Sequence, residues 1–358
     1  RKDEEGRRRI LELIAGRGGD EQPVGHLESL LMPKKATVKQ TPDPTAVLRR
    51  IDDAGCAELG EALAHGHYRV VARAAELAGE RLCYELEPVL IAAFRRLAPL
   101  DHRADPGCQA KGAMARALVG LDCLDAAVFR EGIGLRQPEP VWGGSIDTAA
   151  DVRASCAMGL AATGDPRALI DLVALLSDPE HQARSGAARA IACTAPLAAE
   201  AVLRQKVLVG DAEPEVIGEC LRGLLDIAPE EATAFVAARL DDPSPVVAEL
   251  AALALGESRL DDAVALLRER WEQTPFKRQR DRVLLRAAVL ARTDAAFDWL
   301  LELVAAADDA TAAFIVTELA VYRGNQALAN RLRAAVEQRD DDALCEVFAK
   351  TWGRCSPD

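Results

Sequence analysis

One nine-residue pattern recurs along this chain and leaves it few ways to fold. Its order is apolar, often basic, two variable positions, small, Ala or Leu, variable, small, and finally Leu or Ile. The copies are AKGAMARAL from Ala110, VRASCAMGL from Val152, ARSGAARAI from Ala183, VIGECLRGL from Val216 and VAELAALAL from Val247. At about 100° per residue, the first, fifth, eighth and ninth positions share one helical stripe. Each copy therefore predicts a helix with a small-residue face that a neighbouring helix can approach closely.

Composition and turns extend this prediction to the whole chain. Hydrophobic residues make up 49% of the sequence but aromatics only 4%, so the apolar content is mostly helix-favouring Ala and Leu together with Val. Turn signals built from Gly, Pro and Asp recur about every 15 residues, which is typical of helical hairpins. We therefore predict an all-α protein, an α-solenoid in which antiparallel helix hairpins stack into a superhelix.

The segments DPRALIDLVALLSDPEHQARSGAARAIA (165–192) and DPSPVVAELAALALG (242–256) carry a family resemblance. Their Asp-Pro turns, apolar-basic starts and small-residue endings resemble HEAT repeats, especially the short bacterial kind of phycobilisome-lyase-like proteins. The resemblance covers about residues 55–258 and implies that the second helix of each hairpin lines a concave face. In residues 259–353 the turns keep the spacing of helical hairpins, but the nine-residue pattern is weak, as expected where terminal repeats cap the array.

Two domains follow from this reading. Residues 1–44 form an N-terminal part, with one short amphipathic helix at 4–16 and an irregular tether or cap rich in Gly, Pro, Lys and Thr. Residues 45–358 form the HEAT-like solenoid, with an inserted loop at about 130–148.

The seventh position of the register points away from the packed stripe. It is occupied by Arg116, Met158, Arg189 and Arg222 in four successive copies. One interpretation is a set of solvated arginines, since isolated exposed charges contribute little to stability. The other is an anion-facing groove for an acidic peptide or protein surface.

The basic residues at the second position have a different expected role. Lys111, Arg153 and Arg184 lie at the edge of the stripe. In HEAT proteins this place often belongs to a structural Asp–Arg ladder between neighbouring turns, so the resemblance implies that role here. Asp151 and Asp178 could supply the carboxylates.

One repeat interval is longer than the others. The copies start 42, 31, 33 and 31 residues apart, and the surplus falls within FREGIGLRQPEPVWGGSIDT, residues 129–148. Long loops on solenoids often carry function, and Trp is a common interface anchor. Trp142 at its centre could contact a partner. Alternatively, it could pack back onto the adjacent helices and close the wider gap.

Charge and motifs exclude several function classes. A net charge of −13 disfavours nucleic acid and anionic membranes, and no uncharged apolar run is long enough to span a bilayer. The basic cluster at 277–286 lacks the interleaved aromatics of a stacking platform. No Walker loop, GxGxxG or HExxH occurs, so we expect no catalytic residue, no cofactor and no metal. His65, His67 and His102 lie in turns that could meet at a metal, but polar turn and cap roles explain them better.

The cysteines predict a reducing, cytoplasmic location. There are nine, none in a CxxC pair. Six of them fall among apolar neighbours, where cysteine behaves as a small buried hydrophobe: Cys83, Cys123, Cys156, Cys193, Cys220 and Cys345. The chain begins at Arg1 with no apolar signal segment, so we do not expect secretion.

Two functions remain. The leading hypothesis is a non-catalytic scaffold that binds a partner protein or peptide on the concave face, because a solenoid offers a long surface without a convincing reaction centre. The alternative is a HEAT-like enzyme or enzyme subunit of the DNA glycosylase or bilin-lyase type. A glycosylase would need Trp and Asp gathered on a basic face, to which Trp142, Trp271 and Trp299 could contribute. The oligomeric state stays open.

Overall fold

A computed structural model describes residues 43–274 and 281–353 of the chain. Residues Asp43–Asp358 form one compact unit. The predicted helix at 4–16 and the tether after it lie outside the described residues. None of the described helices is both long and apolar enough to cross a membrane.

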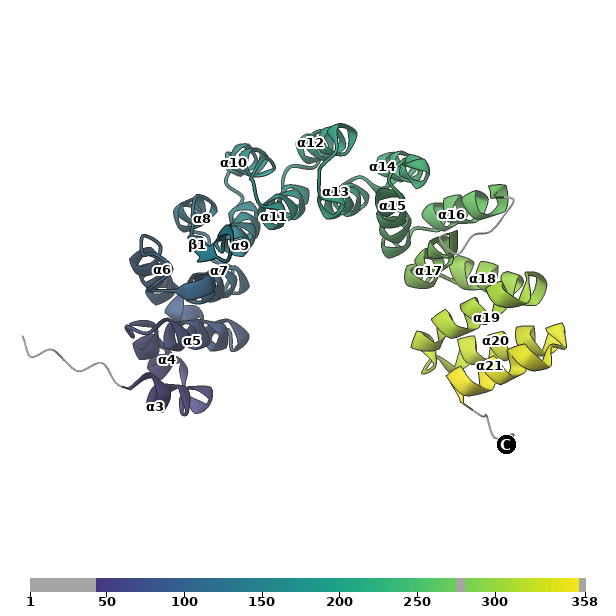
Figure 1. Ribbon diagram of the computed structural model, residues 1–358, viewed down its shortest axis with the longest axis horizontal. Helices are drawn as coiled ribbons and strands as arrows, with labels where there is room; N and C mark the ends of the chain where they lie inside the picture. Colours follow the sequence, from purple (N-terminus) through teal and green to yellow (C-terminus); the bar gives the residue numbers. More distant parts are fainter. Residues whose placement is uncertain (1–42, 275–280, 354–358) are drawn as a thin grey trace, which may run out of the picture. The chain divides into compact units, whose positions relative to one another are not determined.

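The unit consists of helical hairpins (Figure 1). The first helices of the successive hairpins are α4 (Cys56–Leu63), α6 (Glu87–Leu97), α8 (Ala126–Ile133), α10 (Ala168–Leu175), α12 (Pro196–Val209), α14 (Pro229–Ala237) and α16 (Asp261–Gln273). The second helices are α5 (Tyr68–Glu80), α7 (Gln109–Gly120), α9 (Ala150–Ala162), α11 (His181–Ala192), α13 (Pro214–Ile227), α15 (Pro245–Glu257) and α17 (Arg282–Ala291). A short helix, α3 (Pro44–Leu48), precedes them. The 3-10 turns are η1 (Ile51–Asp53), η2 (Tyr84–Leu86), η3 (Pro106–Cys108), η4 (Ala238–Asp241) and η6 (Leu319–Tyr322).

The second helices form a continuous row from α5 to α17, each packed closely on the next (Figure 1). Small residues make this possible. A Cβ added to Gly186 would lie 2.4 Å from the Cβ of Ala154, and one added to Gly256 would lie 2.2 Å from the carbonyl oxygen of Ala287. The first helices pack mainly on their own partners and less on one another. The apolar core is consequently a strip between the two layers. The all-α solenoid predicted from the repeat is confirmed.

The packing changes after α17. Helices α18 (Asp294–Ala306) and α20 (Gln326–Arg339) pack together, as do α19 (Asp309–Glu318) and α21 (Asp342–Trp352), whereas α17 makes little contact with α19. The change occurs where the sequence signature erodes.

The inserted segment between α8 and α9 is a small antiparallel ribbon. Strand β1 (Pro138–Val141) pairs with β2 (Gly144–Asp147), with Val141 opposite Gly144 and Pro138 opposite Asp147. Where the sequence predicted an inserted loop at about 130–148, the chain therefore builds a β-hairpin.

Candidate interaction surface

The residues predicted to line one face sit on consecutive second helices. Arg116 lies on α7, Met158 on α9, Arg189 on α11 and Arg222 on α13. Because these helices pack in order and share one register, the four positions follow one another across the row. Arg116 and Arg189 are exposed, whereas Met158 and Arg222 are half-buried.

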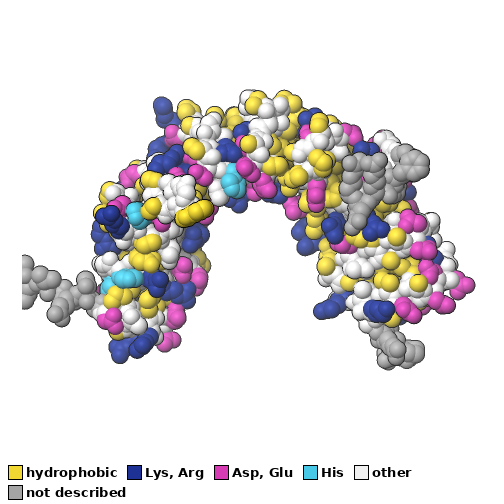
Figure 2. Space-filling model, in the orientation of Figure 1, with side chains coloured by type: hydrophobic (Ala, Val, Ile, Leu, Met, Phe, Trp, Pro, Cys, Tyr) yellow, Lys and Arg dark blue, Asp and Glu magenta, His cyan; other side chains and the backbone are white. Residues whose placement is uncertain are grey.

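The charge of this row is not uniform. Arg222 pairs with Glu219 at 2.7 Å, and its guanidinium lies 3.8 Å from Glu257 of α15. Within the described residues, the side chains of Arg116 and Arg189 make no ion pair. Figure 2 shows basic and acidic side chains interspersed over the visible face. The unpaired positive charge of the row is therefore confined to α7 and α11, because carboxylates neutralise it on α13.

An Asp–Arg ladder runs along the edge where the second helices begin. Arg153 donates to Asp147 at 2.7 Å and to Asp178 at 2.8 Å, and the side chains of Arg153 and Asp178 are 0% exposed. Arg184 donates to both carboxylate oxygens of Asp211, at 2.9 and 2.8 Å. The ladder role expected of Arg153, Arg184 and Asp178 is confirmed.

Two predicted ladder members differ from expectation. Asp151 is exposed in the first turn of α9 and makes no ion pair within the described residues, so its assignment to the ladder is wrong. Lys111 is buried, but its ammonium donates to the Leu100 carbonyl at 2.7 Å and to Gln137 at 2.5 Å. Asp105 instead accepts two backbone N–H groups at the start of α7. The physical reason is local: helix-start N–H groups need acceptors, and this carboxylate supplies them.

The ladder carboxylates share a fixed sequence spacing, which the repeat pattern given above does not include. An Asp stands six residues before the second position of the register in all five copies, at Asp105, Asp147, Asp178, Asp211 and Asp242. Except for Asp105, each accepts the backbone N–H two residues further on, an Asx-turn geometry that prepares the helix start.

His65 takes the equivalent place before the weaker copy of the pattern that begins at Val70. Its Nδ1 accepts the N–H of His67, and the His67 ring in turn caps α5 by accepting the N–H of Arg69. The two histidines thus act as turn and cap residues.

The ladder holds two carboxylates strongly ionised. Burial alone would raise the pKa of Asp211, but hydrogen bonds from Arg184 and Lys206 outweigh it and hold that pKa well below its usual range. At Asp147 the balance is similar. Burial opposes ionisation, and two backbone N–H groups together with Arg153 lower the pKa.

The ribbon between α8 and α9 carries an apolar tip. Trp142 and Gly143 form its two-residue turn, where Gly143 adopts a φ of +86° that side chains disfavour. Trp142 is 102% exposed, Ile146 52% and Val141 43%. The hypothesis that Trp142 packs back onto the adjacent helices is therefore wrong: the ribbon holds it in solvent.

The base of the ribbon is anchored by hydrogen bonds, most of them partly buried. Glu139 accepts hydrogen bonds from the backbone of Gly107 at 2.6 Å, from Thr148 at 2.7 Å and from Gln137 at 2.9 Å. Asp147 accepts from the backbone N–H of Gln137 at 2.9 Å and also pairs with the ladder. These contacts tie both strands to the starts of α7 and α9.

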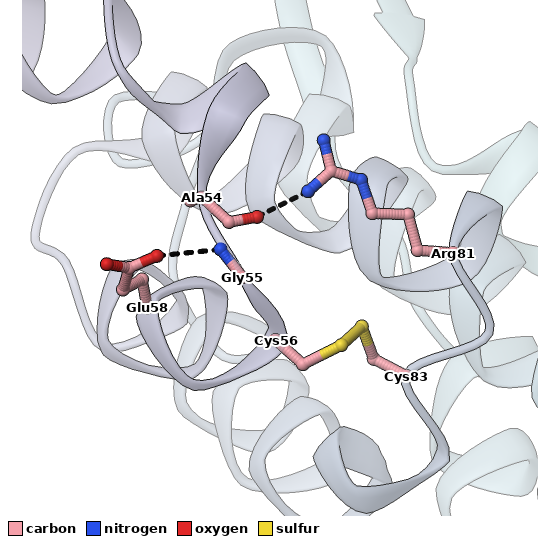
Figure 3. The surroundings of a disulfide bond; sticks show 6 residues. All are labelled: Ala54, Gly55, Cys56, Glu58, Arg81 and Cys83. Carbon is pink, nitrogen blue, oxygen red and sulfur yellow. Dashed lines mark hydrogen bonds between the residues drawn. A yellow bond between two sulfur atoms is a disulfide. The ribbon is translucent and has the colours of Figure 1, made fainter.

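A disulfide joins Cys56, at the start of α4, to Cys83, just after α5 (Figure 3). Beside it, Arg81 donates to the Ala54 carbonyl and Glu58 accepts the N–H of Gly55. Cys83 is buried as expected, but its assignment as a free thiol is wrong because tertiary packing brings Cys56 within bonding distance.

The remaining cysteines divide by burial. Burial raises the pKa of Cys123 to about 11 and the pKa values of Cys156 and Cys220 to about 12, so these thiols resist ionisation. Cys193 and Cys345 are exposed, contrary to expectation.

Metal-ligand side chains cluster at one place in the described part of the chain, where Cys56, Cys83 and Glu85 lie together. The two sulfurs there are bonded to each other, which leaves Glu85 as the sole ionic ligand. This group is not a fitting metal site.

Two of the tryptophans and the basic cluster at 277–286 are the features that could have supported nucleic-acid binding. Trp271 and Trp299 are buried in the core and cannot stack on a base. In the basic cluster at 277–286, residues before 281 lie outside the described part. Arg282 and Arg286 both stack over Phe314, and Arg286 also pairs with Glu318 at 3.2 Å.

The stacked hairpins, the closely packed second helices and the Asp–Arg ladder together define a HEAT-like α-solenoid. In agreement, residues 201–288 match the family model of HEAT repeats. A comparison with curated proteins found no match.

Two solved structures are similar to this chain. An engineered protein has 19% sequence identity, with 87% of this chain and 91% of that chain covered and a TM-score of 0.39. The complex of CpcE and CpcF of phycocyanin lyase from Nostoc sp. PCC7120 has 14% identity, with 90% and 100% covered and a TM-score of 0.35. Similarity at this level carries no conclusion about activity.

Proposed function

We propose that this chain is a non-catalytic scaffold that binds a partner protein or peptide on the concave face of its solenoid. Neighbouring second helices pack more closely than neighbouring first helices. A stack of hairpins bends toward its more closely packed side, so the second helices form the concave face. Concave solenoid surfaces are suited to extended partners.

The observation that carries this proposal is the surface formed by Arg116, Met158 and Arg189. Two arginines, on α7 and α11, lie on either side of a half-buried methionine on α9 and form no ion pair with the part of the chain that the structure describes. Arginine is suited to bidentate carboxylate recognition, and methionine adapts to varied apolar side chains. This combination fits a partner segment that presents acidic residues around an apolar one.

The test is quantitative co-purification of the full chain and its Arg116→Glu/Arg189→Glu variant from the source organism. Because both arginines are exposed and make no ion pair with residues 43–274 or 281–353, the double charge reversal should preserve the fold. A partner held by this face should be lost, since like charges placed opposite each other disfavour binding.

Arg323→Glu is the matched control, because Arg323 is exposed near the C-terminal end and away from α7 and α11. The proposal requires that the partner stay with this control and leave the double variant. An identical set of partners with all three proteins would overturn it.

A further inference from the structure

The apolar tip of the β1–β2 ribbon has a defined geometry. The pairing register places Glu139 opposite Ile146 and Val141 opposite Gly144. Because side chains alternate along a strand, Val141 and Ile146 share one face of the ribbon with Glu139 and with the side-chain-free Gly144. Trp142 projects from the turn beyond them. The tip therefore offers one large aromatic and a small apolar face behind it.

The ribbon is held in position before any partner arrives. Glu139, Gln137 and Asp147 are half-buried or buried, and their hydrogen bonds fasten both strands at the base. Exposing the Trp142 side chain to water is unfavourable, yet the two-strand insertion holds it in solvent. A preorganised aromatic loses little conformational entropy on docking, which favours binding.

We propose that this ribbon is a second docking element, independent of the concave face, which inserts Trp142 into an apolar pocket of a partner protein. The pocket would hold an acceptor for the indole N–H, as buried Trp side chains require. Val141 and Ile146 would pack on the pocket rim. The ribbon lies in the turn before α9, whereas the concave-face residues lie within the second helices.

The charge of the chain selects a protein pocket over a lipid surface. The charged side chains of the ribbon, Glu139 and Asp147, are both acidic, and the chain carries a net charge of −13. An anionic bilayer would repel such a surface, and three apolar side chains alone anchor weakly.

A second copy of the chain is also a poor recipient. The cavity between η4 and α17 is lined about equally by apolar and charged side chains, the latter including Asp241, Arg270, Arg282 and Arg286. Burying an indole there would also take several of these charged side chains out of water, which is unfavourable. The recipient is therefore a different protein.

Site-specific photocross-linking tests this assignment. The photoreactive residue benzoylphenylalanine replaces Trp142 in the full chain. Val321, which is 73% exposed and lies in η6, is the control position. After irradiation in lysate of the source organism, a protein adduct should form from position 142 and not from position 321. The adduct is then identified, purified and titrated against the unmodified chain.

For that purified protein, Trp142→Ala should weaken binding at least about 30-fold, the loss typical of an interface hot spot. Trp142→Phe should restore most of the affinity, and Val321→Ala should change nothing. The melting temperature of Trp142→Ala should equal that of the parent, because the exposed indole supports no other part of the fold. The Arg116→Glu/Arg189→Glu variant should still form the adduct, which separates this proposal from the concave-face one.

The proposal is overturned by any of three results. These are the absence of a position-142 adduct, an adduct with a second copy of the chain, and an adduct protein whose affinity is unchanged by Trp142→Ala. It is also overturned if vesicles of phosphatidylcholine and phosphatidylglycerol co-sediment the parent chain but not Trp142→Ala, since the tip would then be a membrane anchor.

Discussion

The buried guanidinium of Arg153 allows the sharpest stability prediction. It donates to Asp147 at 2.7 Å, to Asp178 at 2.8 Å and to the Leu135 carbonyl at 2.9 Å, and its side chain is 0% exposed. Arg153→Met keeps most of the side-chain volume but removes every one of these donors. Asp178, whose side chain is also 0% exposed, would then keep only Arg136 at 2.8 Å as an ionic partner.

Removing one member of a buried ion pair usually lowers the free energy of unfolding by about 3–5 kcal/mol, because the other charge stays buried without compensation. Since Asp178 keeps one partner here, we expect a loss of about 3 kcal/mol. A repeat array need not unfold in one step. The loss should therefore appear first at the ribbon and the start of α9, where Arg153 acts.

Hydrogen exchange measured by mass spectrometry resolves that region. Amides of β1, β2 and the first turn of α9 should exchange roughly 100-fold faster in Arg153→Met than in the parent, the factor equivalent to the expected free energy. Amides of α15 and α17 provide the internal control and should be unchanged.

A double-mutant cycle isolates the ion pair. Asp178→Asn should destabilise the parent, but in the Arg153→Met background it should cost much less, because it removes the uncompensated charge. An Arg153→Met variant that loses less than about 1 kcal/mol, or equal costs of Asp178→Asn in both backgrounds, would refute the reasoning.

Two further predictions concern packing and pH. Gly256→Ala would force α15 away from the α17 backbone and should destabilise the protein by about 2 kcal/mol, measured by urea unfolding. The control is Gly120→Ala, whose added methyl would have nothing within 4 Å and should leave the stability unchanged or slightly higher. Asp211 has a lowered pKa when folded, so its stabilising contribution is present above the unfolded value of about 3.9 and disappears as pH falls through the folded value. The melting temperature should therefore fall less steeply between about pH 5 and about pH 2 in Asp211→Asn than in the parent, and parallel curves would contradict this.

The helical repeat could be predicted because its signal is local. Small and apolar residues recur at helical spacing, so each helix and its packed face follow from a few neighbouring residues. The same register located the second helices, the four positions that point away from their packed stripe, and the extra segment before Val152. The fixed spacing of the ladder carboxylates was equally local and could have shown that Asp147, not Asp151, pairs with Arg153.

The charge of the surface and the pairing of the cysteines depend on contacts between distant parts of the chain. Arg222 is neutralised partly by Glu257 from the next second helix, while Arg116 and Arg189 meet no such partner among the described residues. Cys83 bonds to Cys56 across a hairpin. Periodicity states which way a side chain points but not which side chain from another repeat will meet it.

For the inserted segment, too, some features follow from the sequence and others only from the tertiary structure. The sequence determined its length, its glycine turn and the presence of Trp142. Whether that indole would close a gap or stand in water depended on how Gln137, Glu139 and Asp147 bind the starts of two helices. Only the tertiary structure brings those acceptors and donors together, and it is their hydrogen bonds that hold Trp142 away from the core.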